Sequence, residues 1–85
     1  MDKFKTDVAK AFGQTLRKAR EAAGLSQEML ALSSGIDRSF VSMLERGVCH
    51  PSLSTVLVLA DSLKIAPCEL LAGVQFLARK RKVSG

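Results

Sequence analysis

Residues 27–47 read QEMLALSSGIDRSFVSMLERG and contain two short helical patterns separated by one glycine. In the first pattern, Leu30, Ala31 and Ser34 fall on one helical face at spacings of one, three and four residues. Gly35 can adopt a positive φ without a Cβ penalty, which suits a sharp turn at a helix C-terminus. Asp37 is a candidate N-cap for a second helix, because its carboxylate can accept hydrogen bonds from free backbone N–H groups. The stretch therefore predicts two short helices joined by a tight turn.

The second of these helices has two chemically different faces. Val41 and Leu44 form an apolar pair that we expect to face the core. The opposite face is mostly polar and carries Arg38, Ser39, Ser42 and Met43, with Arg46 at the helix end. In a helix-turn-helix, the second helix enters the major groove and reads base edges with its N-terminal residues. The pattern predicts a helix-turn-helix with double-stranded DNA as its partner.

The same stretch resembles the Cro/repressor-like (XRE-type) family of bacterial and phage regulators. That family's pattern is Q-x-x-L-A-x-x-x-G-[ILV]-x-x-x-x-[IV]-S-x-[LI]-E-[RN]-G. It is matched here at Gln27, Leu30, Ala31, Gly35, Ile36, Val41, Ser42, Leu44, Glu45, Arg46 and Gly47. The similarity continues into PSLSTVLVLADSLKIAPCELLA and spans about residues 12–72. Within the family, the segment DRSFVS most resembles the small controller proteins of restriction-modification systems.

The resemblance implies roles for several residues. A glutamine at the position of Gln27 contacts DNA phosphate in the family, the alternative being an exposed residue at a helix start. Arg38 follows the expected cap and is the candidate for the main base contact, the alternative being a solvated surface charge. Met43 is open to two interpretations, contact with a thymine methyl group or partial burial. Arg20 and Glu45 match a pair that joins two helices by a salt bridge, which we expect to be structural.

The chain as a whole is predicted to be all-α, with five helices. We expect the first from about residue 8 to 23, the second after Ser26, the third after Asp37, the fourth from Ser52 to about residue 63 and the fifth from Pro67 to residue 72. Residues 1–7 are then an N-terminal extension, residues 8–72 the helix-turn-helix domain and residues 73–85 a basic tail. The segment around Phe76 and Leu77 can extend a helix or remain loose.

Composition and charge agree with one small domain inside the cell. The chain has 85 residues, 47% of them hydrophobic, and a formal charge of +5. The run Arg79–Lys82 supplies four of the thirteen basic residues, which leaves nine basic against eight acidic residues and a net charge of +1 elsewhere. The run is either a solvated charge cluster or an arm that adds phosphate contacts. With no membrane-length apolar run and no signal peptide, we expect a cytoplasmic protein encoded by a bacterium or phage.

Catalytic and metal-binding chemistry is not expected. Cys49, His50 and Cys68 are the only soft ligands, and their spacing provides neither a CxxC pair nor a four-ligand zinc set. We expect both cysteines to be reduced. The sequence predicts no enzyme activity, no cofactor, no metal and no small-molecule ligand.

The expected fourth helix is apolar on nearly all sides. Its inward stripe is Leu53, Val56, Leu59, Ala60 and Leu63, and Leu57 and Val58 add apolar side chains outside that stripe. We expect these two residues to form a homodimer interface, the alternative being that they lie under the segment around Phe76 and Leu77. A regulator that binds a palindromic operator as a homodimer is the leading hypothesis. An interaction module, such as the antitoxin of a toxin-antitoxin pair, is the alternative.

Overall fold

The computed structural model describes residues 2–80, with side chains up to residue 77. The all-α fold expected from the sequence is confirmed: the described residues form helices and contain no strand. Residues 2–80 form six helices, where five were expected. They are α1 (Lys3–Ala22), α2 (Gln27–Ser34), α3 (Arg38–Arg46), α4 (Leu53–Leu63), α5 (Pro67–Leu70) and α6 (Ala72–Lys80).

Helix α1 begins at Lys3, so the expected start near residue 8 is wrong. The Asp2 side chain accepts a hydrogen bond from the backbone N–H of Phe4 at 3.3 Å and caps the first turn. Lys3 and Asp7 then pair along the helix at 3.0 Å. These first turns are mostly exposed, and the apolar periodicity that marked the helix in the sequence begins only at Val8. Residues 3–7, expected as an extension, are the N-terminal part of α1.

The turn between α2 and α3 follows the expected chemistry with one difference. The Ser26 hydroxyl accepts from the backbone N–H of Met29 at 3.0 Å, and Gly35 ends α2 at φ 72°. Asp37 does occupy the N-cap position of α3, but its carboxylate accepts no backbone N–H. The carboxylate instead binds the hydroxyl of Ser39, two residues along. The expectation that Asp37 caps α3 through its side chain is therefore wrong.

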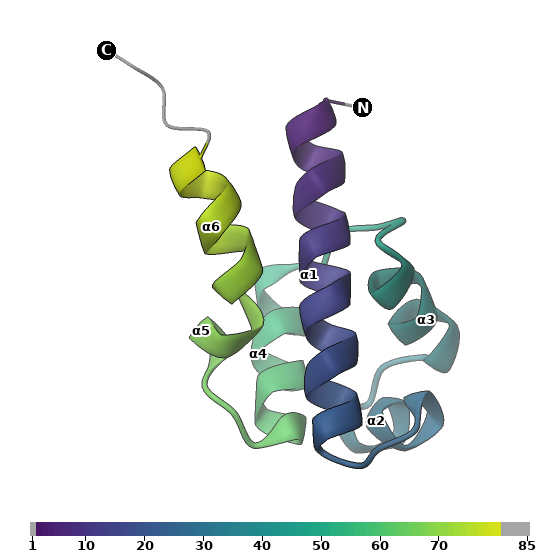
Figure 1. The fold of residues 1–85 in the computed structure, drawn as a ribbon. Helices are drawn as coiled ribbons and strands as arrows, with labels where there is room; N and C mark the ends of the chain where they lie inside the picture. Colours follow the sequence, from purple (N-terminus) through teal and green to yellow (C-terminus); the bar gives the residue numbers. More distant parts are fainter. Residues whose placement is uncertain (1, 81–85) are drawn as a thin grey trace.

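The core is a cluster of aliphatic side chains around one phenylalanine. Its fully buried members, from all helices except α6, are Phe12, Leu16, Leu30, Val41, Leu44, Leu59 and Leu70. Helix α1 passes through the middle of the molecule, with α3 on one side and α6 on the other (Figure 1). It lies close to α3 at Gly13, where an added Cβ would lie 2.3 Å from the carbonyl oxygen of Leu44. Glycine is required there because any side chain would collide with the backbone of α3.

The C-terminal half contradicts one expectation and decides between two open alternatives. Leu53 is 74% exposed at the first position of α4, so it does not belong to the inward stripe in which it was placed. The segment around Phe76 and Leu77, whose state was left open, is helical and packs as α6 along α1. Of the basic run Arg79–Lys82, residues 81 and 82 lie outside the described residues, as do the side chains of residues 79 and 80.

Candidate DNA-binding surface

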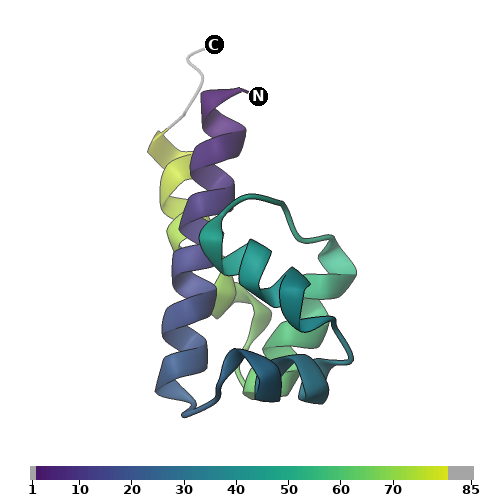
Figure 2. The same ribbon diagram turned by 90° about the vertical axis from the view of Figure 1, so that its right-hand side faces the viewer.

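One concave surface gathers the residues that the sequence singled out on α2 and α3. It lies between the start of α2 and the outward face of α3, two helices that face the same side of the molecule (Figure 2). Its lining residues are Gln27, Asp37, Arg38, Ser39, Ser42, Met43 and Arg46. All six residues expected to contact DNA are in this set. The expectation had omitted Asp37, which enters the surface through its bond to Ser39.

Helix α3 presents this surface because its opposite face is anchored in the core. Val41 and Leu44 are completely buried, and Phe40 is partly buried against the same core. Arg38 is exposed at the first position of the helix, and Arg46 is exposed at the last. Packing thus fixes one face of α3, while the polar groups on the opposite face stay accessible.

The charge of the surface is positive. Its lining has two arginines, Arg38 and Arg46, against one carboxylate, Asp37, and neither arginine forms an ion pair among the residues that the structure describes. A guanidinium without a partner presents its donors in a planar fork that matches a phosphate or a guanine edge. Met43 is partly buried and also lines the surface, so its burial leaves part of the side chain accessible.

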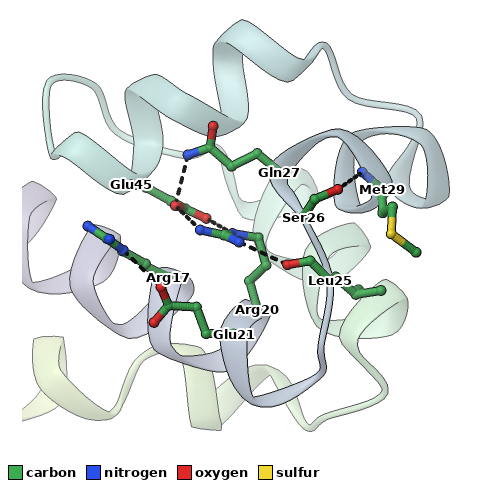
Figure 3. Close-up of polar contacts among 8 residues, drawn as sticks. All are labelled: Arg17, Arg20, Glu21, Leu25, Ser26, Gln27, Met29 and Glu45. Atoms are coloured by element: carbon green, nitrogen blue, oxygen red, sulfur yellow. Dashed lines mark hydrogen bonds and ion pairs between the residues drawn. The ribbon is translucent and has the colours of Figure 1, made fainter.

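A network of polar side chains lies behind this surface (Figure 3). Arg20 on α1 donates to Glu45 on α3 through Nε at 2.6 Å and through Nη2 at 3.0 Å. The two side chains are 12% and 4% exposed. The hydrogen bond to Glu45 raises the pKa of the Arg20 guanidinium above its usual value, against the opposing effect of burial. The pair expected from the resemblance is thus brought together with bidentate geometry.

Gln27 joins the same network, which the sequence did not indicate. Its Nε2 donates to Glu45 at 3.0 Å, while Arg20 also donates through Nη1 to the carbonyl oxygen of Leu25 at 2.8 Å. Gln27 and Glu45 are separated by eighteen residues. No local pattern marks such a contact, because it depends on how α2 and α3 are placed in space.

The cysteines and the histidine singled out in the sequence lie in the loop after α3 and in α5. Burial raises the pKa of the Cys49 thiol, an effect that the nearby charge of Arg46 opposes, so Cys49 is held as a weakly nucleophilic thiol. His50 and Cys68 are exposed. Within residues 2–80, no three His, Cys, Asp or Glu side chains are grouped so that they could hold a metal ion. None of the described helices is long and apolar enough to span a membrane.

The two residues expected at a dimer interface remain accessible. Leu57 is 50% exposed and Val58 40% exposed on α4. Helix α6 packs along α1, and its Phe76 is itself exposed. Within the described residues, α6 therefore does not provide the cover over Leu57 and Val58 that the alternative requires.

Known proteins resemble the chain along most of its length. The family model described as helix-turn-helix matches residues 16–70. The crystal structure of the restriction-modification controller protein C.AhdI from Aeromonas hydrophila superimposes with a TM-score of 0.72 and 53% identity, covering 73% of this chain and 94% of that one. Control protein C.SmaI of Serratia marcescens is 34% identical over 65 residues, which are 76% of this chain and 77% of that protein.

A longer relative shows that the domain also occurs in larger proteins. The uncharacterized HTH-type transcriptional regulator y4dL of Sinorhizobium fredii is 36% identical over 66 residues, 73% of this chain. The chain spans only 34% of the length of that regulator. These relatives are transcriptional regulators and not enzymes. The chain belongs to the helix-turn-helix family of DNA-binding transcriptional regulators.

Proposed function

We propose that this protein controls the genes of a restriction-modification system by binding a palindromic operator as a homodimer. The likeness to C.AhdI and C.SmaI, which are named as controller proteins, supports that biological setting. The observation that carries the proposal is the concave surface that contains Gln27, Arg38, Ser39, Ser42, Met43 and Arg46. Repression of its own promoter is the expected mode of control, and the bacterial cytoplasm the expected place.

Each residue of the surface is assigned the contact that its chemistry allows. Arg38, exposed at the N-terminus of α3, makes the discriminating contact as a bidentate donor to the O6 and N7 atoms of guanine. Ser39 and Ser42 contribute short contacts to bases or backbone, and Met43 packs on a thymine methyl group. Gln27 and Arg46, at the rim, bind phosphate oxygens.

Dimerisation provides the second half of the site. Leu57 and Val58 expose apolar surface on α4, and a two-fold contact between copies would remove it from water. Such a dimer would present two recognition helices about 34 Å apart, one turn of B-DNA. The proposal requires no metal, cofactor or small-molecule ligand.

Selection of bound sequences from a random DNA pool tests this function directly. We expect enrichment of an inverted repeat whose half-sites are centred about one helical turn apart. The Arg38→Ala variant, selected in parallel, should lose the preference at one guanine in each half-site. Absence of any enriched motif with the unmodified protein at moderate salt would overturn the proposal and favour an antitoxin-like interaction module.

A further inference from the structure

The carboxylate of Glu45 connects three helices at one point. It accepts two hydrogen bonds from Arg20 on α1 and one from Gln27 at the first position of α2, while belonging itself to α3. Arg20 also donates a hydrogen bond to the carbonyl oxygen of Leu25, just before α2. The side chain of Glu45 is 4% exposed, so water cannot easily replace these donors.

The orientation of the Gln27 amide follows from the chemistry of its partner. An ionised carboxylate only accepts hydrogen bonds, so the amide nitrogen must face Glu45, and the amide oxygen must point away. Figure 3 shows this arrangement, with the oxygen of Gln27 on the side remote from Glu45. The amide nitrogen carries two hydrogens, and Glu45 takes one of them. The second N–H remains for another acceptor.

The fixed amide lies on the concave surface together with Arg38 and Arg46. A carboxylate so close to this surface would repel a phosphate if its charge were not balanced. Arg20 supplies that balance, because a guanidinium is protonated at any ordinary pH and this one is bonded to both oxygens of Glu45. The network therefore orients the Gln27 amide and neutralises the charge of Glu45, and both effects favour an approaching phosphate.

We propose that Glu45, itself oriented by Arg20, is a positioning residue that aims the free N–H of Gln27 at a DNA phosphate. This assignment rests on the proposed function and extends it. A glutamine without this bond would have to be ordered on binding, whereas here its side chain is already ordered in the free protein. The Arg20–Glu45 pair therefore contributes to operator affinity as well as to the stability of the fold.

A double-mutant cycle on operator affinity tests the assignment. The variants are Gln27→Met, which keeps the length of the side chain without a donor, Glu45→Asp, which keeps the charge but shortens its reach, and their combination. We expect each single change to weaken binding about tenfold and the combination to weaken it no further. Glu45 acts on affinity only by orienting the Gln27 amide, so changing Glu45 has no further effect once that amide is gone. A purely structural role would lower the unfolding midpoint and leave the affinity of the folded protein unchanged.

The controls separate this inference from the proposed function. Gln14→Met makes the same substitution at an exposed glutamine on α1, outside the concave surface, and should retain full affinity. All variants are assayed well below their unfolding midpoints, and Arg20→Lys replaces Glu45→Asp in the cycle if the latter does not fold. Losses that multiply to about a hundredfold in the double variant, or full affinity of Gln27→Met, would overturn the inference. Failure of the unmodified protein to bind any DNA would instead overturn the proposed function.

Discussion

Replacement of Gly13 by alanine should destabilise the protein even though alanine is the better helix former. A Cβ at residue 13 would lie 2.3 Å from the carbonyl oxygen of Leu44 and 2.7 Å from that of Glu45. Both atoms belong to the backbone of α3 and cannot rotate away. Ordinary contact begins at 3.4 Å, so α1 and α3 must separate by about 1 Å.

The two opposing effects differ in size. Removal of a glycine from a helix interior gains about 1 kcal/mol of helix propensity. Overpacking against a rigid partner costs up to about 3 kcal/mol, and the same separation would strain the Arg20–Glu45 pair. The net loss is about 2 kcal/mol. For a domain of this size, a loss of about 2 kcal/mol lowers the unfolding midpoint by roughly 8 to 16 °C.

Thermal unfolding followed by circular dichroism, at one fixed protein concentration, measures this effect. Gly73→Ala is the matched control, because Gly73 is also helical and its added Cβ would meet the hydroxyl of Thr15 at 3.2 Å, with the other neighbours at ordinary distances. That variant should unfold within a few degrees of the original protein. A midpoint for Gly13→Ala at or above that of the original protein would refute the reasoning and show that α3 can move freely away from α1.

Three further changes test the ion pair, the base contact and the dimer. Glu45→Gln leaves the charge of Arg20 without a partner and should lower the free energy of unfolding by about 3 kcal/mol. Glu21→Gln, in an exposed pair, should change the free energy of unfolding by less than about 1 kcal/mol. Equal unfolding midpoints for the two variants would contradict the role assigned to burial. Arg38→Ala should weaken specific binding by about 1 to 3 kcal/mol more than non-specific binding, and equal losses on all sequences would make Arg38 a phosphate contact. Combined Leu57→Lys and Val58→Glu should yield monomers on sedimentation with weaker operator binding, and a variant that remains dimeric would place the interface elsewhere.

Much of the fold could be predicted because its determinants are local. Ser26 and Ser52 cap the helices that follow them, and each needs only a hydroxyl within three residues of a free N–H. Gly35 and Gly47 end α2 and α3 at φ 72° and 73°, a conformation that glycine adopts without strain. Helix type and turn position follow directly from such residues.

The features that sequence reasoning missed depend on neighbours distant in the chain or on exposed turns. The first turns of α1 lack an apolar stripe, so only the cap at Asp2 marks their start. The bond between Gln27 and Glu45 requires α2 and α3 to be placed correctly. The side chain of Asp37 has two kinds of local partner available, and residue type alone does not decide between the Ser39 hydroxyl and a backbone N–H.

Helix α3 and the turn after it are attached to α1 at three points. The glycine at residue 13 allows the two backbones to touch, Glu45 is bound to Arg20, and Gly47 sits directly against the backbone of Lys10, where a Cβ would come within 2.8 Å of its Cα. Under the proposed function α3 is the recognition helix, and these contacts resist a change in its angle from one DNA sequence to another. We therefore expect differences in affinity between operators to arise mainly at the side chains of the concave surface and in the deformation of the DNA. Substitutions on that surface should therefore change sequence preference, whereas substitutions between α1 and α3 should reduce affinity for all sequences together.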